Sequence, residues 1–304
     1  MKYSIAIALA LSTPLAVMAQ TTVFNDNFAT DASDPSSSYL SAVSGGSMAW
    51  ASGTGMTLTA PTTGHLSDIV GSFSAVTLAN TGDYISLVVD FNSPNLGQGG
   101  TSLAGLIMMA LDNSQGVSPT SAGPTESINS SATGGPTAGY LGYAGDIQMQ
   151  TSAKTSTKFF AKIAGTPNLN NLTYNSNVAP KSGNFTTSGT GNAALANNDL
   201  YTLTYTITAL NTGASQLGVT AQIYDNTTST VVDDVTIASA SAVPTSVFDV
   251  FDIGLYSGNE PTGYTLNLTD LSVLTGVSAV PEPASFALVG LGLLGLVGYR
   301  RMRR

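Results

Sequence analysis

The stretch Tyr201-Thr202-Leu203-Thr204-Tyr205-Thr206-Ile207-Thr208-Ala209 decides the fold class of this chain. Every second residue in it is apolar or aromatic, and every residue between them is a threonine. A period of two predicts a β-strand with one buried face and one face toward solvent. The turn Asn211-Thr212-Gly213 follows, and the segment Leu217–Ile223 then repeats the alternation.

Further short segments with strand character occur along the middle of the chain, separated by polar turns. They are Met56–Ala60, Tyr84–Phe91, Leu103–Leu111, Lys158–Ile163, Val231–Ile237, Phe251–Leu255 and Leu266–Leu274. Leu103–Leu111 would also suit a turn of buried helix, but the flanking Gly and Thr residues favour a central strand. The pattern predicts an all-β fold, an antiparallel β-sandwich like a jelly roll, that holds residues 20–279 as one domain.

The N-terminal segment Met1–Ala19 reads as a signal peptide for secretion. Lys2 supplies the positive start, an apolar run extends from Ile5 to Val17, and the small Ala19 precedes Gln20. We expect cleavage between Ala19 and Gln20. A permanent N-terminal membrane helix is the alternative, and the small-residue ending disfavours it.

The C-terminal segment 280–304 has three parts: Pro281-Glu282-Pro283, the uncharged run Ala284–Tyr299, and a basic cluster of Arg300, Arg301, Arg303 and Arg304. As a helix the run 284–299 would span about 24 Å, which is short for a transmembrane helix in a bilayer core of roughly 30 Å. The arginines should stay in the cytoplasm as a stop-transfer cluster. Pro-Glu-Pro would then lie outside the membrane, where the two prolines favour an extended backbone.

This order of motif, hydrophobic run and basic cluster resembles the PEP-CTERM sorting signal of Gram-negative bacteria. The resemblance implies that an exosortase-type transpeptidase acts at Pro281-Glu282-Pro283. It also implies a route through the secretion translocon and an inner-membrane intermediate to the cell surface or the extracellular matrix. An ordinary C-terminal membrane anchor is the alternative interpretation of the same segment.

The composition between the two ends excludes several function classes. The chain has 9 basic and 18 acidic residues, and its basic residues between the end segments are all lysines: Lys154, Lys158, Lys162 and Lys181. Binding to nucleic acid needs basic patches, so it is not expected. The chain contains no cysteine, which excludes disulfides, thiolate metal sites and thiol catalysis.

Candidate catalytic residues are few. The single histidine, His65, fits an exposed turn, and no G-x-S-x-G elbow is present for a serine triad. Glycosidases need two neighbouring carboxyls. Glu126 and Glu260 are far apart in sequence, and pairs such as Asp233-Asp234 and Asp249/Asp252 read as solvated turn or edge residues. We therefore expect no enzyme activity and no catalytic metal.

Oxygen ligands for calcium are plentiful, although no D-x-D-x-D-G loop is present. The candidate acids for a structural calcium are Asp26, Asp31, Asp34, Asp225 and Asp270. Phe24–Phe28 and Tyr264–Val273 resemble the first and last strands of concanavalin-type jelly rolls, whose termini often pair, and a calcium would bridge those strands. Capping of turns by Asp is the alternative role for these side chains.

Sugar binding would use an aromatic platform beside hydrogen-bonding groups. Trp50, Tyr140 and Tyr143 are the candidate sugar contacts, and packing in the core or at an edge is the alternative for each. The sequence as a whole predicts an exported cell-surface or matrix protein with a non-enzymatic, structural or adhesive role. A carbohydrate-binding module of the exopolysaccharide matrix is the alternative, and a glycosidase is less favoured.

Overall fold

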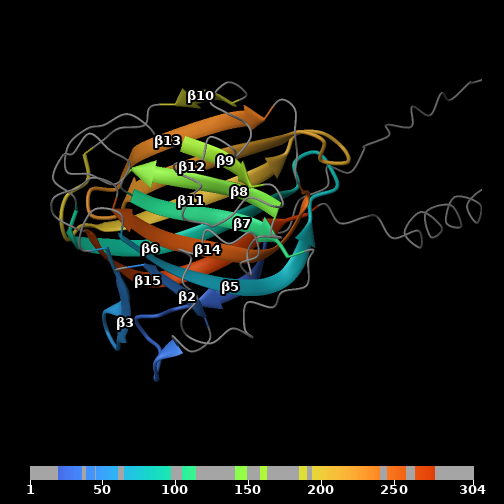
Figure 1. Cartoon of the computed structure of the whole chain (residues 1–304). Coiled ribbons are helices and arrows are strands. Elements are labelled where there is room, and N and C mark those ends of the chain that lie inside the picture. The colour runs from blue at the N-terminus through green and yellow to red at the C-terminus, as the bar shows by residue number, and fades with distance from the viewer. Residues whose placement is uncertain are drawn as a thin grey trace, which may run out of the picture. The chain divides into compact units, whose positions relative to one another are not determined.

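The computed structural model describes the chain from Gln20 to Val277, where residues 20–277 form one compact unit (Figure 1). The residues described are 20–35, 39–44, 46–60, 65–96, 105–113, 141–148, 158–162, 185–189, 194–239, 245–257 and 264–277. The expected signal peptide and the expected tail 280–304 lie outside them. Within these ranges the chain forms fifteen strands and no α-helix.

Nine strands form the larger sheet, in which all neighbours are antiparallel. Its strands, in spatial order, are β10 (Phe185–Gly189), β13 (Thr230–Ser239), β12 (Leu217–Asp225), β11 (Leu200–Ala209), β6 (Tyr84–Asn95), β15 (Tyr264–Gly276), β4 (Gly55–Ala60) and β3 (Ser47–Ala51). The ninth strand, β1 (Gln20–Asp26), also pairs with β15.

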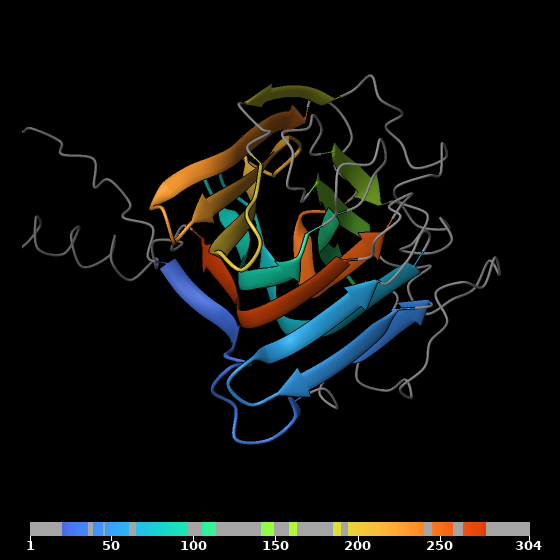
Figure 2. The same cartoon turned by 90° about the vertical axis from the view of Figure 1, so that its left-hand side faces the viewer.

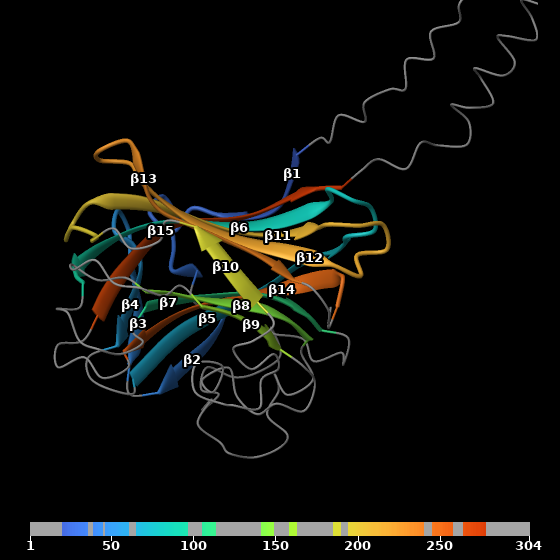
Figure 3. The same cartoon turned by 90° about the horizontal axis from the view of Figure 1, so that it is seen from above.

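Six strands form the smaller sheet, which is antiparallel as well. Their order is β2 (Leu40–Ser44), β5 (His65–Thr77), β14 (Val247–Ser257), β7 (Gly105–Asp112), β8 (Leu141–Gln148) and β9 (Lys158–Lys162). Figure 3 shows the two sheets as stacked layers, with the larger sheet above the smaller one. The expected antiparallel β-sandwich is confirmed.

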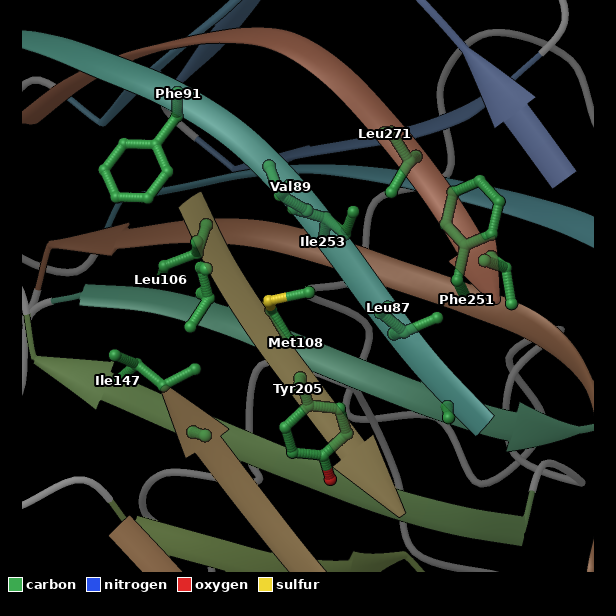
Figure 4. Close-up of a cluster of buried hydrophobic side chains, with 14 of the residues drawn as sticks. Leu87, Val89, Phe91, Leu106, Met108, Ile147, Tyr205, Phe251, Ile253 and Leu271 are labelled. Atoms are coloured by element: carbon green, nitrogen blue, oxygen red, sulfur yellow. The ribbon is translucent and has the colours of Figure 1, made fainter. Parts of the chain in front are cut away.

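The core lies between the two layers and is built by the alternation that the sequence shows. On β11, Tyr201, Leu203, Tyr205 and Ile207 are at most 1% exposed, and the threonines between them are partly exposed on the other face. Figure 4 shows how apolar side chains of β6 face those of β7 and β14 across this space. The labelled side chains that meet there include Leu87, Val89, Leu106, Met108 and Ile253.

The strand predictions are confirmed for nine segments, and five strands were missed. The strand β11 pairs with β12 from Tyr201↔Asp225 to Ala209↔Leu217, around a turn in which Gly213 has φ of 78°. Of the predicted segment Leu103–Leu111, the described residues 105–111 form a strand, as favoured, within β7 (Gly105–Asp112). The missed strands β2, β3, β5, β8 and β10 are either five residues long or interrupted by glycines, so they lack a clear period of two.

The first and last strands pair, as the jelly-roll resemblance implied. β1 lies beside β15 with Gln20 opposite Gly276 and Asp26 opposite Leu271 (Figure 2). A register shift between Thr22 and Phe24 interrupts the ladder. After the shift, Phe24 packs on the core with its ring centroid 5.0 Å from that of Phe251. The pairing thus places the first and last strands of the domain side by side in the larger sheet.

Candidate functional site

Three of the five acids proposed for calcium come together where β1 ends. Asp26 closes β1, Asp31 follows in the next turn, and Asp270 lies on β15. Burial raises the pKa of Asp26, and repulsion from Asp31 and Asp270 raises it further, while a hydrogen bond donated by the Tyr39 hydroxyl lowers it. Burial also raises the pKa of Asp270, with repulsion from Asp90 adding to it. These carboxylates destabilise one another electrostatically.

The geometry of these acids does not make a complete cation site. Within the described ranges, no group of three or more His, Cys, Asp or Glu side chains is arranged to hold a metal ion. Asp34 is exposed, and Asp225 lies elsewhere, at the end of β12. The Asp225 carboxylate accepts hydrogen bonds from the backbone N–H groups of Thr227 and Thr228 at 2.8 and 3.0 Å. Burial opposes ionisation of Asp225, but these hydrogen bonds outweigh it and lower the pKa. Asp225 therefore has the turn-capping role that was the alternative.

A second pair of carboxylates, which the sequence reasoning missed, lies on the smaller sheet. Asp68 on β5 is 1% exposed and Asp252 on β14 is 0% exposed. Asp68 lies opposite Gly254, and Asp252 lies opposite Val70. Directly opposed residues of an antiparallel pair share a face, so the two acids are diagonal neighbours on one face of the sheet. Ile69 and Ile253 point the other way, into the core between the sheets.

Gly254 makes room for the Asp68 carboxylate. A Cβ at position 254 would lie 1.9 Å from Asp68 Oδ1, so the carboxylate would have to move. That oxygen is buried without a hydrogen-bond partner. Burial, with repulsion from Asp252 as the second cause, therefore raises the pKa of Asp68 well above its usual range. Chemically, the pair can keep a proton on Asp68, but neither side chain is accessible to a dissolved substrate.

The expectation that Asp252 and Asp233 are solvated was wrong. Asp252 is fully buried and Asp233 is 8% exposed. The alternation Phe251-Ile253-Leu255 suggested a strand with one solvent face, yet Val250 is also buried, at 1% exposed, so β14 is covered on both sides. A continuous run of apolar residues on either side of Asp252 is the signal that could have shown this.

The structure describes two of the three candidate sugar contacts, Trp50 and Tyr143. Trp50, on β3, packs against the core and donates a hydrogen bond from Nε1 to the carbonyl oxygen of Phe28 at 2.8 Å. Tyr143, on β8, is 1% exposed, and its ring centroid lies 6.4 Å from that of Phe248. Tyr140 lies outside the described residues. For Trp50 and Tyr143 the structure shows the packing role that was the alternative.

The remaining predicted residues lie at the ends of the chain or at a strand boundary. His65 begins β5, opposite Ser257, and does not lie in a turn. Gln20, the expected first residue after cleavage, begins β1. Ala19, the Pro-Glu-Pro motif, the run 284–299 and the arginine cluster lie outside the described residues. In the part of the chain that is described, no helix is long and apolar enough to span a membrane.

Comparison with protein families identifies the tail. Residues 279–304 match the PEP-CTERM protein-sorting motif, and this match includes Pro281-Glu282-Pro283 and the four arginines. The C-terminus thus carries a PEP-CTERM sorting motif, which is a signal of exported proteins. No curated protein sequence matches the chain.

Among solved structures, several lectins are similar to the chain. Peanut lectin with a nine-residue peptide is 9% identical with a TM-score of 0.43, and the match covers 84% of this chain and 97% of the lectin. The potassium-bound carbohydrate recognition domain of Emp46p is 12% identical with a TM-score of 0.44, with 82% and 94% covered. Lectin II from Ulex europaeus is 11% identical with a TM-score of 0.43, with 84% and 98% covered. Such values are too low to carry a ligand or an activity over to this chain.

Proposed function

We propose that this chain is a non-enzymatic cell-surface or extracellular-matrix protein that an exosortase-type transpeptidase sorts to its destination. The observation that carries the proposal is the PEP-CTERM motif at residues 279–304, directly after the compact unit that ends at Val277. The last strand, β15, ends at Gly276, so only a few residues separate the folded sandwich from Pro281. The sandwich is the cargo, and the tail is its sorting signal.

The proposed route uses both ends of the chain. The signal peptide directs the chain to the secretion translocon, and cleavage after Ala19 leaves Gln20 as the first residue. The run 284–299 then holds an inner-membrane intermediate, with the arginines on the cytoplasmic side. The transpeptidase acts at Pro281-Glu282-Pro283, where two prolines keep the backbone extended and without pairing donors.

The carboxylates that the structure describes disfavour a glycosidase. A glycosidase needs two carboxyls that reach the substrate at a defined separation. Among the described residues, the buried pair Asp68 and Asp252 is at most 1% exposed and cannot reach a substrate. The chain has no cysteine nucleophile and a single histidine. We therefore assign no reaction to the domain.

A structural calcium is not needed for the proposed role. Asp26, Asp31 and Asp270 offer oxygen atoms at the junction of the first and last strands, as expected for a bridging ion. In the described ranges, these acids are not arranged as a group of three or more that could hold a metal ion. Calcium binding is therefore a separate question that a melting experiment answers.

The sorting proposal is tested in the host with a triple variant, Pro281→Ala with Glu282→Ala and Pro283→Ala. We expect the variant to remain uncleaved in the membrane fraction, with the intact mass of a chain that begins at Gln20 and ends at Arg304. The wild type should instead lose the tail. The matched control, Pro119→Ala with Pro124→Ala, changes the same residue type outside the tail and should be processed normally. Normal processing and delivery of the triple variant would refute the proposal.

A further inference from the structure

We propose that the outer face of the nine-stranded sheet binds a neutral polysaccharide, with Tyr84 as the aromatic contact. The outer face is the one that points away from the smaller sheet, and it is formed by β1, β15, β6, β11 and β12. The inference goes beyond the proposed delivery to the surface. Sorting could fail while the face still binds, and binding could fail while sorting is intact.

Alternation along β6 places Tyr84 on this face. Ile85, Leu87 and Val89 are at most 1% exposed and belong to the core between the sheets. Successive side chains of a strand point to opposite faces, so Tyr84 and Ser86 point outward. Tyr84 is partly exposed. In Figure 3 this outer face is the upper surface of the upper layer.

The Tyr84 ring lies down on the sheet because its neighbour is a glycine. Gly276 on β15 is directly opposite Tyr84, and a Cβ there would lie 2.2 Å from Cε1 and 2.8 Å from Cζ of the ring. The ring therefore occupies the space that a side chain at position 276 would need. Tyr84 is partly exposed, so the part of the ring that is not packed on Gly276 is open to solvent on this face. Aromatic rings that are apolar on the face and polar at the tip are typical contacts for sugar rings.

Hydroxyl groups lie on the strands to either side of the ring. Thr208 on β11 lies directly opposite Tyr84, at a Cβ separation of about 5 Å. Thr22 on β1 lies opposite Leu274, one outward position along β15 from Gly276. Among the described residues, neither hydroxyl has a hydrogen-bond partner, in contrast to Ser86 and Thr206, whose hydroxyls bond each other at 2.7 Å. Thr22 is exposed and Thr208 is partly exposed, so both can bond to a ligand.

The charge of this face selects against acidic polymers. Within the described ranges, the lysines are Lys158 and Lys162, and both lie on β9 of the other sheet. The acids of these strands on the outer face, Asp90 and Asp270, lie opposite each other near the middle of β6 and β15, six residues along from Tyr84 and Gly276 respectively. An anionic polysaccharide would find no cation among the described residues of this face, and where it extends along the strands it would be repelled by Asp90 and Asp270. A second copy of the chain would place like charges against each other, whereas a neutral polysaccharide meets no such repulsion.

The test uses the compact unit Gln20–Val277 in native gels that contain dextran, glucomannan, barley β-glucan or, as the anionic arm, alginate. We expect retardation by at least one neutral polysaccharide and none by alginate. Tyr84→Ala should weaken that retardation at least about tenfold, as for the loss of an anchoring aromatic side chain. Tyr84→Phe keeps the ring and should stay within about threefold of the wild type.

Tyr224→Ala is the matched control. Tyr224 lies on the same face, opposite Thr202 of β11, whereas Tyr84 lies opposite Thr208 near the other end of that strand. This control is measured with a tetrasaccharide of the polymer that retards the wild type, because such a ligand is too short to extend from Tyr84 to Tyr224. The Tyr224→Ala variant should bind the tetrasaccharide like the wild type. If Tyr84→Ala does not fold by circular dichroism, Thr208→Arg replaces it, since an arginine there would cover the ring. Failure of all three neutral polymers to retard the protein would overturn the proposal. So would unchanged binding by the Tyr84 variant, or a wild-type dimer in light scattering that Tyr84→Ala dissociates.

Discussion

Replacing Asp68 with asparagine should stabilise this protein at neutral pH and flatten the dependence of its stability on pH. Asp68 is 1% exposed, its Oδ1 has no hydrogen-bond partner, and Asp252 lies diagonally across the same face of the sheet. Both burial and this neighbour raise the pKa of Asp68 above 3.8, the ordinary value for aspartate. Asn has nearly the same shape and carries no charge at any pH.

The sign follows from proton binding in the two states. Because the pKa of Asp68 is higher in the folded state, that state holds more protons than the unfolded chain between pH 3.8 and the folded pKa. The free energy of unfolding should therefore fall as pH rises through this window, by at most about 1.4 kcal/mol per pH unit for one group. Burial also raises the pKa of Asp26, Asp249 and Asp270, so these groups add to the same trend.

Urea unfolding of residues 20–277 at pH 5, 6 and 7 measures this. We expect the wild type to be more stable at pH 5 than at pH 7, and Asp68→Asn to lose part of that difference. Asp34→Asn is the matched control at an exposed aspartate, and it should change the stability by no more than about 0.5 kcal/mol at each pH. If Asp68→Asn destabilises the protein at pH 7 and keeps the wild-type slope, Asp68 is held ionised by a compensating charge and the reasoning fails.

Three further predictions concern other positions in the sandwich. Gly55→Ala should destabilise the protein by about 3 kcal/mol or more in urea unfolding, because φ is +97° and the new Cβ would lie 2.0 Å from the carbonyl oxygen of Leu268. The control Gly53→Ala, where φ is +80° and nothing lies within 4 Å of the new Cβ, should cost only about 1 kcal/mol, and equal costs for the two variants would contradict the steric argument. Tyr205→Phe should leave the stability unchanged or raise it by up to about 1 kcal/mol, because the buried hydroxyl has no hydrogen-bond partner to lose. A clearly lower melting temperature of this variant would show that the hydroxyl does make a hydrogen bond. Calcium or EDTA should leave the melting temperature of residues 20–277 unchanged. In the described ranges no group of three or more His, Cys, Asp or Glu side chains is arranged to hold a metal ion, and a ligand raises the melting temperature only by binding the folded state. A rise with calcium would show a cation site.

The sequence predicts best those strands whose two faces differ. In β11, threonines alternate with large apolar residues, so period and burial agree and the register with β12 follows from the turn. Strand β8 shows the opposite case, because its glycines look like a loop. In the structure Gly142 lies against the carbonyl oxygen of Ala110, and Gly145 lies against the Tyr205 ring, so both are required by neighbours that are distant in sequence.

The candidate sites depend even more on long-range pairing. Asp68 and Asp252 are separated by most of the domain in sequence, and only the register of β5 with β14 brings them together. The same holds for Tyr84, whose ring orientation depends on a glycine at the far end of the chain, Gly276. A sequence pattern reports the face of a residue within its own strand, but not which residue the neighbouring strand places beside it.

The pairing of β15 also determines how the protein would bear mechanical load. A chain attached through the C-terminus that follows β15 is pulled at Gly276, and β15 transmits that force into the fold. Its whole length is bonded to β6 on one side, while β4 and β1 together cover the other side at residues 264–268 and 271–276. A pull along β15 therefore shears two ladders of hydrogen bonds at once and does not unzip a strand from an open edge. Fluid drag on an attached chain would therefore load a strand that is hydrogen-bonded on both sides.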